Sequence, residues 1–437
     1  MIAVSRTRSG WGNFPRIHTR ALAFDSEADL GAIVAGGREL IAHGNGRSYG
    51  DSALGSSIIE VRPHGFFLGF DADRGFLHVQ AGVMLSEILE VFVPRGWFLS
   101  ITPGTKLITV GGAIASDVHG KNHHVAGCFS SCVERFRLML PGGRIALCSR
   151  QENADLFRAT CGGMGLTGVI LDAVIGLQPI PSAFIDQVTV RTRNLEETFE
   201  AFEEHGKSSY SVAWIDCLAR GEKLGQCLLM TGEFSPEGGL DYRSGRGVGV
   251  PFYFPSRVLN TTTVKAFNRF YHGRVKERVS RQRVGIDGFF YPLDAIDHWN
   301  RIYGKDGFTQ YQFVLPAKES FQGLKEILEM LAWAGKGSFL AVLKSCGPGN
   351  DNYLSFPMQG YSLALDFRIE DGVFGLLDRL DERVVHYGGR IYLTKDVRMG
   401  RQVFEAGYPE LDAFRALRKA YGMDKVFNSL QSRRLGL

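Results

Sequence analysis

The sequence lacks several features that would place it in a particular class of protein. Its 437 residues contain no apolar run of about 18 residues, the length that a helix needs to cross a bilayer, and residues 1–6 do not resemble a signal peptide. The seven cysteines form neither a Cys-x-x-Cys pair nor a zinc-binding spacing, and their odd number argues against a disulfide framework. We therefore expect a soluble, cytoplasmic chain with reduced thiols and no metal site.

The chain also has little excess charge. Its formal net charge is +4 and its isoelectric point about 8.6, which is too mild to predict nucleic-acid binding. A slightly basic surface suits an anionic phospholipid or a lipid phosphate, although ordinary scatter of charges explains it more simply. With 44% apolar and 22% charged residues, the composition is that of a globular protein long enough for two domains.

Glycine, in contrast, is abundant, and two segments about fifty residues apart concentrate it. The first segment spans residues 43–51 and the second spans residues 102–124. Glycine lets backbone N–H groups approach a ligand where a Cβ atom would clash, and successive N–H groups in such turns bind anions. Two such segments predict one long ligand that contains phosphate.

The spacing of the glycines narrows the choice of ligand. Gly44-x-Gly46-x-x-x-Gly50 is one residue longer than the motif that binds NAD in a Rossmann fold. The later run from Gly162 to Gly168 lacks the Lys-Ser/Thr pair that completes a P-loop. A flavin dinucleotide or a phosphosugar remains.

Four segments resemble those of a known family, namely residues 44–51, residues 102–124, Gly163-x-Gly165-Leu166-Thr167-Gly168 and Tyr392-x-x-Lys395-Asp396. Together they are similar to the FAD-binding oxidoreductases of the vanillyl-alcohol oxidase (PCMH) type. Within that superfamily, HGKNHH, YQFVLP, SFP-x-x-GY and LTKD most resemble the decaprenylphosphoryl-β-D-ribose 2′-oxidase family. The similarity covers nearly the whole chain, and it implies FAD as the cofactor.

The periodicity of apolar residues predicts an α+β fold. In the first part we expect strands at residues 39–42, 57–61, 76–81 and 169–175, and helices at residues 26–36 and 85–94. After Pro181 we expect strands at residues 185–191, 310–315 and 363–368, and helices at residues 195–205, 317–334 and 372–387. This pattern, with the resemblance, predicts a two-domain flavoprotein of the vanillyl-alcohol oxidase type, in which an FAD-binding domain precedes a substrate domain with an antiparallel sheet and helices.

The predicted boundaries are 1–180 for the FAD-binding domain, 181–395 for the substrate domain and 396–437 for a C-terminal segment. The resemblance implies that the last segment, which has a helical pattern at residues 411–418, returns to the FAD-binding domain. Residues 235–249 and the basic residues 265–283 show no periodicity of their own. Both a mobile lid and a merely solvated loop remain open for these two stretches.

The resemblance also implies which residues contact the cofactor: Gly44, Asn45, Gly46, Arg47, Ser48, Tyr49, Gly50, Asp51, Gly104, Thr109, Val110, Gly111, Gly112, Ser116, Asp117, His119, Gly168, Val169 and Tyr392. Many members of the superfamily have a flavin-linking histidine where this chain has Arg47. His43 is four residues earlier and should not replace it, so we expect noncovalent FAD.

Oxidation of a secondary alcohol needs a group that takes the hydroxyl proton and groups that stabilise the reduced flavin. By resemblance, Lys395 is the active-site lysine and His119 the histidine near the flavin ring. Without the resemblance, a lysine at a strand end is ordinarily a surface residue and a lone histidine is usually structural. The same resemblance implies substrate contacts by Lys121, Tyr291, Gln312 and Lys344.

These observations predict an FAD-dependent oxidation of the 2′-hydroxyl of a polyprenylphosphoryl-β-D-ribose to the 2′-keto sugar, the first half of an epimerisation to arabinose. A separate NAD(P)H-dependent reductase would complete it, and the lipid-linked substrate would bring the chain to the inner membrane face. The main alternative is an FAD-dependent oxidase of soluble alditols or aldonolactones with oxygen as acceptor. A flavin-binding partner protein with a decayed site is a third, and retention of both His119 and Lys395 argues against it.

One position departs from the family. In the strand after SFP-x-x-GY, this chain has Ala364 where the family often has a cysteine. We therefore expect insensitivity to inhibitors that form a bond with that thiol.

Overall fold

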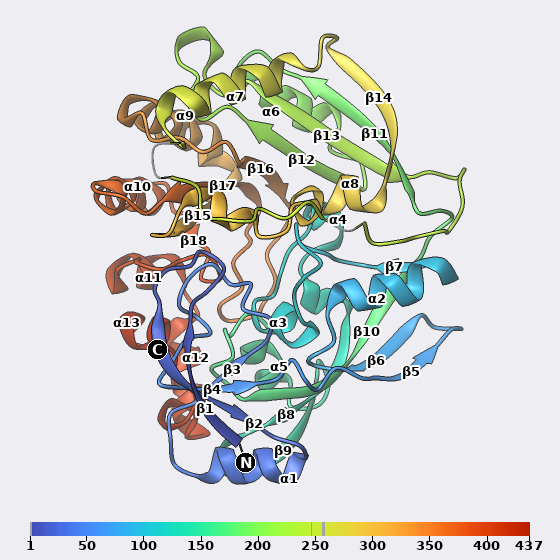
Figure 1. The fold of residues 1–437 in the computed structure, drawn as a ribbon, viewed down its shortest axis with the longest axis vertical. Coiled ribbons are helices and arrows are strands. Elements are labelled where there is room, and N and C mark those ends of the chain that lie inside the picture. Colours follow the sequence, from blue (N-terminus) through green and yellow to red (C-terminus); the bar gives the residue numbers. More distant parts are fainter. Residues whose placement is uncertain (1, 246, 256–257) are drawn as a thin grey trace.

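The computed structural model describes residues 2–245, 247–255 and 258–437. Figure 1 shows two stacked halves. The lower half contains the N-terminal strands and helices together with the last helices of the chain, and the upper half is built around a large sheet. Both helices and sheets occur in each half, so the α+β prediction is confirmed.

Two sheets form the lower half. The four-stranded sheet has the order β1-β2-β4-β3, and the other sheet has the order β5-β6-β10-β8-β9 with β7 paired to β10. The strands are β1 (Ile2–Arg8), β2 (Ile17–Ala23), β3 (Ile41–His43), β4 (Ser57–Glu60), β5 (Phe67–Asp71), β6 (Phe76–Gln80), β7 (Trp97–Leu99), β8 (Val133–Met139), β9 (Ile145–Ser149) and β10 (Val169–Pro179). The helices are α1 (Glu27–Ala35), α2 (Leu85–Phe92), α3 (Val110–Ala115), α4 (His123–Ala126) and α5 (Ala154–Thr160).

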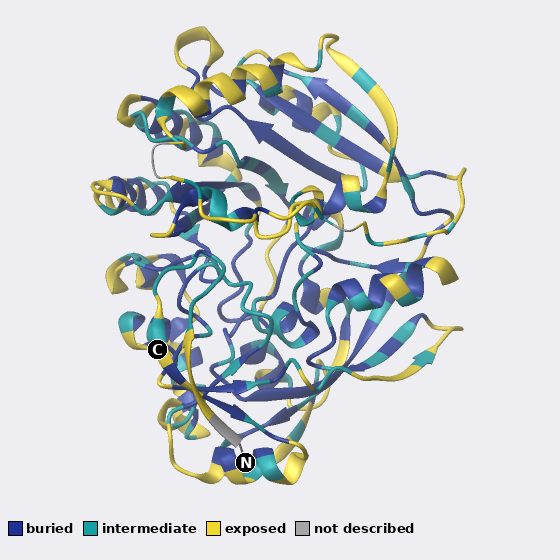
Figure 2. Cartoon of the chain, in the orientation of Figure 1, coloured by how far each residue is buried: buried dark blue, intermediate teal, exposed yellow. Residues whose placement is uncertain are grey.

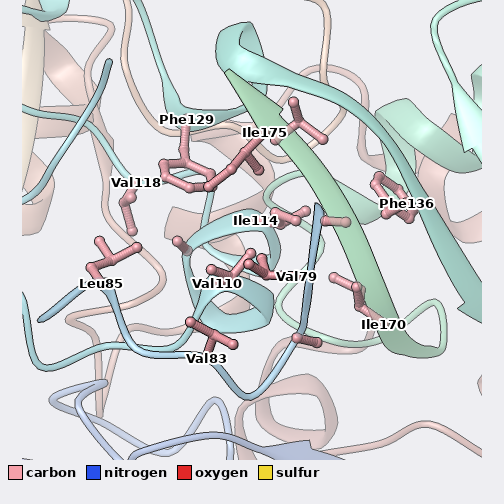
Figure 3. Packing of buried hydrophobic residues seen from close by; sticks show 14 of the residues in the cluster. Val79, Val83, Leu85, Val110, Ile114, Val118, Phe129, Phe136, Ile170 and Ile175 are labelled. Atoms are coloured by element: carbon pink, nitrogen blue, oxygen red, sulfur yellow. The ribbon is translucent and has the colours of Figure 1, made fainter. Parts of the chain in front are cut away.

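Local sequence explains where these elements begin and end. The Ser26 hydroxyl accepts the backbone N–H of Asp29 at 3.1 Å, and Gly36 caps the other end of α1, as the pattern over residues 26–36 predicts. In α3, Val110 and Ile114 pack against Val79 of β6 and against β10 (Figure 3). This packing anchors the second glycine segment to the core of the lower half.

An eight-stranded antiparallel sheet forms the upper half, with the order β14-β11-β13-β12-β16-β17-β15-β18. Its strands are β11 (Phe184–Arg191), β12 (Tyr210–Ile215), β13 (Cys227–Phe234), β14 (Val279–Gly285), β15 (Phe308–Pro316), β16 (Ala341–Cys346), β17 (Gly360–Arg368) and β18 (Arg390–Ile391). The helices α6 (Leu195–Glu204), α9 (Ala317–Ala334) and α10 (Val373–His386) pack with it in one core, because their apolar residues recur at helical spacing.

The loop interpretation of residues 265–283 is wrong. The structure has α7 (Thr261–Gly273) and β14 there, with the short α8 (Ile286–Phe290) directly after. The buried side of α7 includes Asn268 and His272, which bond to Asp216 and to the Thr192 carbonyl oxygen. Because these buried residues are polar, a search for apolar periodicity does not find the helix. Of the predicted loop at residues 235–249, Arg246 lies outside the described residues.

The last helices are α11 (Arg401–Gly407), α12 (Leu411–Ala420) and α13 (Leu430–Leu435). Leu40 exchanges backbone hydrogen bonds with Val426 and Asn428, and the Leu430 N–H donates to the Leu54 carbonyl oxygen. The C-terminal segment thus contacts the lower half; the exact domain limits stay a prediction. Among the helices in the described part of the chain, none is long and apolar enough to span a bilayer.

Candidate active site

A cavity of about 950 Å³ lies between the two halves and contains most of the predicted site residues. Its lining includes these eighteen: Gly44, Asn45, Gly46, Arg47, Ser48, Tyr49, Gly104, Thr109, Gly111, Gly112, Ser116, His119, Lys121, Gly168, Gln312, Lys344, Tyr392 and Lys395. They come from segments that are far apart in the sequence. The fold therefore combines both glycine segments, the upper sheet and the Lys395 turn in one space.

The two glycine segments contact each other directly. A Cβ atom on Gly44 would lie 2.5 Å from the Thr109 hydroxyl oxygen, and the Asn45 side-chain amide donates to the Leu107 carbonyl oxygen at 2.8 Å. Thr109 itself caps α3 by accepting the Gly112 N–H. Glycine at position 44 is thus required by the close approach of the two segments as well as by any ligand.

The first glycine segment also holds the turn that contains Lys395. A Cβ atom on Gly50 would lie 1.8 Å from the Asp396 carbonyl oxygen, and the Tyr49 N–H donates to the Thr394 carbonyl oxygen at 3.1 Å. Arg434 forms ion pairs with Asp51 at 2.8 Å and with Asp396 at 2.9 Å. These contacts fix the turn that follows β18, where the sequence pattern alone suggests a longer strand.

The Lys395 ammonium group lies 3.8 Å from the centre of the Tyr49 ring, a cation–π contact. Burial lowers the pKa of Lys395 to about 7, Asp366 opposes the shift, and Lys344 adds to it. Asp366 is itself buried, and it accepts the Gln310 side-chain amide at 2.6 Å. Its pKa is raised by burial to about 7, so the carboxyl group is a weak counter-charge for the lysine.

Two further lysines share the cavity. Burial and then the charge of Lys344 lower the pKa of Lys121 to about 7, and burial lowers the pKa of Lys344. Lys121 donates to the Phe289 carbonyl oxygen, and its ammonium lies 4.5 Å from the centre of that ring. Within the described residues, the ion pairs include neither of these lysines nor Lys395. A bound anion would supply the missing negative charge.

His119 is buried and neutral. Burial, together with Lys344, His123 and Lys395, keeps its pKa well below the ordinary value. The Gln312 side-chain amide nitrogen lies 3.1 Å from Nε2, which places the ring proton on Nδ1 if that amide donates. Nδ1 has no hydrogen-bond partner among the described residues, so it is a free donor beside the cavity. A neutral imidazole of this kind can orient a ligand but holds no proton to lose as an acid.

One face of the upper sheet forms a wall of the cavity, and its character changes across the sheet. Gln310 and Gln312 of β15 and Lys344 of β16 form a polar end. Towards β13 the lining turns apolar, with these residues: Val342, Val212, Trp214 and Met230. Phe267 and Tyr271 of α7 and Phe289 of α8 also line this part. We call it the apolar arm; Gln187 and Gln282, paired across β11 and β14, line the cavity at its far edge.

Six predicted site residues are not in the lining: Gly50, Asp51, Val110, Asp117, Val169 and Tyr291. Val110 packs in the core of the lower half (Figure 3), as does Val169. The Asp117 carboxylate accepts from Ser130, Asn350, Asn352 and Ser355 and so fastens the second glycine segment to residues 350–355. The Tyr291 hydroxyl is bonded to Thr102 at 2.7 Å. Their cofactor or substrate contacts stay predictions, whereas the bonds and packing are structural.

The sequence gave no signal for a buried network around Lys106. Its ammonium donates to Asp287 at 2.6 Å, to the Tyr242 hydroxyl at 2.9 Å and to Ser244 at 3.0 Å. Tyr242 and Ser244 belong to the predicted loop at residues 235–249, so the network holds this loop against the second glycine segment. Asp287 and Asp294 lie about 180 residues later, and only the fold brings them to Thr105 and Lys106.

The residues present fit an FAD group. Gly104 lines the cavity and has open space where a Cβ atom would stand, so its backbone is free to contact a ligand. The Arg47 guanidinium lies 3.9 Å over the Trp11 ring, and its buried Nε has no partner among the described residues. His43 is outside the cavity lining, and its Nδ1 contacts the Gly44 carbonyl oxygen. Arg47 thus occupies the cavity where a flavin-linking histidine is expected in other members of the superfamily.

Comparison with known proteins agrees with this geometry. Residues 21–149 match the model of an FAD-binding domain, which contains both glycine segments. The fold, the cavity and this match define the class: the protein is an FAD-dependent oxidoreductase that acts on CH–OH groups, with FAD as its cofactor.

Relatives identify the family within that class. The chain is 35% identical, over 98% of its length and 97% of the relative, to decaprenylphosphoryl-β-D-ribose oxidase of Mycolicibacterium smegmatis. It is 31% identical to an uncharacterized protein in the mprA 5′ region of Streptomyces coelicolor, over 81% of this chain and all of that protein. Bovine L-gulonolactone oxidase matches only 38% of the chain and 37% of its own length, at 28% identity. The chain belongs to the decaprenylphosphoryl-β-D-ribose oxidase family of FAD-binding oxidoreductases.

Proposed function

We propose that the protein oxidises the 2′-hydroxyl of a polyprenylphosphoryl-β-D-ribose to the 2′-keto sugar. The main support is the joint presence, in one cavity, of three lysines without carboxylate partners among the described residues and an adjoining apolar arm. A phosphate joined to an isoprenoid chain has the matching chemistry. The full-length relative, whose name states a decaprenylphosphoryl-ribose substrate, is a second support.

The chain's own residues account for the proton and the position of the sugar. Lys395, with a pKa of about 7, is partly uncharged at neutral pH and can accept the proton of the hydroxyl group. FAD, when bound, supplies the acceptor for the hydride that leaves the sugar carbon. The ammonium that results on Lys395 then compensates the negative charge that the reduced cofactor gains.

Two lysines are assigned to the phosphate. Lys344 lies on β16 near the boundary between the polar end and the apolar arm, and Lys121 contacts Phe289 of the arm. This boundary is where the phosphate of such a substrate would lie, with the sugar towards Lys395 and the isoprenoid in the arm. Gln312 and neutral His119 would orient the sugar hydroxyls.

The proposed product is a keto sugar, which must be reduced to complete an epimerisation. A separate NAD(P)H-dependent reductase and a product of arabinose configuration follow from this proposal.

An anaerobic absorbance titration tests the function. Polyprenylphosphoryl ribose should bleach the flavin band near ~450 nm, and acid precipitation should release free FAD into the supernatant. Bleaching by alditols or aldonolactones but not by the lipid-linked sugar would instead support the soluble-sugar oxidase. FAD that remains in the pellet would contradict noncovalent attachment.

A further inference from the structure

The exposed side of α7 combines basic and aromatic residues. Lys265, Arg269 and Phe270 are exposed, whereas Val264, Asn268 and His272 are buried against the upper half. Between Thr261 and Arg283 the sequence has seven lysines and arginines and one acidic residue, Glu277. Figure 2 shows α7 as a largely exposed band along the outer edge of the upper half.

An aromatic path leads from this surface into the cavity. Phe270 is 74% exposed and Phe267, one turn earlier, is 39% exposed and also lines the cavity. The ring of Phe267 stacks on Tyr271 with 5.5 Å between centres, and Tyr271 lies 4.8 Å from Trp214 in the apolar arm. Thus apolar surface continues from the outside of α7 to the inside of the arm.

A second exposed apolar segment lies along the rim of the same cavity. Residues 248–254 run beside residues 295–301 through backbone hydrogen bonds, and Ile296, Asp297 and His298 of that stretch line the cavity. Phe252 in this segment is 62% exposed. Exposed aromatic residues therefore occur on more than one side of the arm.

We propose that the outer face of α7, defined by Lys265, Arg269 and Phe270, docks on the surface of a bilayer that contains anionic lipid. Basic side chains attract such a surface, and an exposed phenylalanine inserts at the level of the headgroups. Docking in this way places the aromatic path against the lipid, so that an isoprenoid can enter the arm without crossing water. The proposal rests on the proposed function for the reason to approach a membrane, and it adds the surface that does so.

Vesicle co-sedimentation of the full-length, FAD-loaded protein tests the proposal without any substrate. The protein should bind vesicles of phosphatidylcholine mixed with phosphatidylglycerol and bind pure phosphatidylcholine vesicles much less. Lys265→Glu with Arg269→Glu should weaken binding to the anionic vesicles about tenfold or more, because each basic residue at the surface adds to the attraction. Phe270→Ser should also weaken binding, by severalfold.

Matched controls lie at the other end of the molecule. Arg20→Glu with Arg38→Glu makes the same change in net charge near β2 and α1, and Phe66→Ser removes another exposed phenylalanine, 66% exposed, beside β5. Both controls should bind anionic vesicles like the unchanged protein. All variants should retain FAD and the thermal unfolding temperature, which excludes a loss of fold.

Three results would overturn the proposal: no binding to anionic vesicles, equal binding to neutral and anionic vesicles, or equal loss in the α7 variants and the controls. Self-association that is abolished by Phe270→Ser, without vesicle binding, would assign the face to a second copy of the chain and also overturn it. Vesicle binding with no oxidation of lipid-linked ribose would leave the docking surface standing and contradict the proposed function instead.

Discussion

The polar end and the apolar arm of the cavity are built on one face of the same sheet, yet they are held in different ways. At the polar end, Lys395 and His119 lie on turns that backbone and side-chain hydrogen bonds fix to the first glycine segment and to Gln312. In the arm, Trp214 and Tyr271 meet mainly through ring packing. Directional bonds hold reacting groups in position, whereas packing defines a volume that tolerates a flexible apolar chain.

The largest expected effect is at the polar end. Lys395→Met should lower the rate of flavin reduction by the lipid-linked sugar about 10³-fold, within the range found for general bases. FAD content should not change, because the lysine is not needed to hold the glycine segments together. Stopped-flow absorbance measures the rate.

Lys318→Met on the exposed side of α9 is the matched control and should reduce its flavin at the normal rate. Near-normal reduction by Lys395→Met would remove this lysine from the mechanism.

Lys344→Met should weaken substrate binding rather than slow the chemical step. Loss of one charged hydrogen bond to the phosphate costs about 1.5–3 kcal/mol, so the apparent Kd from the reduction kinetics should rise about 10- to 100-fold. The limiting rate at saturating substrate should stay within severalfold of normal. A normal Kd with a much lower limiting rate would place Lys344 at the reacting atoms instead.

The pH dependence of reduction reports on the same lysines. Because the pKa of Lys395 is lowered to about 7, its uncharged form increases as pH rises through that value, and the rate should increase about tenfold between pH ~6 and ~8. Lys344 contributes to lowering this pKa, so Lys344→Met should move the profile to higher pH. A flat profile, or one that falls with pH, would contradict proton transfer to Lys395.

A polar substitution in the arm should affect only long substrates. Met230 lines the arm, and Met230→Gln keeps its length while removing apolar surface. The apparent Kd for a long-chain polyprenylphosphoryl ribose should rise about tenfold, given the cost of losing a buried apolar side chain. A short-chain analogue should bind as before, and Met230→Leu should resemble the unchanged protein. Equal weakening for both substrates would place the isoprenoid elsewhere.

The smallest change tests the boundary between the two ends. Ala364 lies opposite Gln312 in one neighbouring strand and Val342 in the other, and none of the seven cysteines lines the cavity in the described part of the chain. Ala364→Cys should leave oxidation nearly unchanged but make it sensitive to thiol-modifying reagents. The unchanged protein should resist the same treatment. Protection of the new thiol by substrate would show that it faces the occupied cavity.

Much of the architecture could be predicted because local patterns are strong. Helices at residues 26–36 and 317–334 occur close to the predicted limits, since capping groups and apolar spacing are encoded within each segment. The prediction failed at α7, whose buried Asn268 and His272 are satisfied by Asp216 and Thr192, more than fifty residues away. Tertiary hydrogen bonds make such polar residues acceptable in an interior, and they erase the local pattern.

By itself, the sequence determined the kind of cofactor and the order of the elements that surround it. Closely spaced glycines permit backbone approach to a phosphate whatever the rest of the chain does, so this information is local. Only the tertiary structure decided that Lys121, Lys344 and Lys395 share one cavity while Tyr291 is bonded outside its lining. Their lowered pKa values come from burial and from charges on other segments, and these depend on distances that exist only after folding.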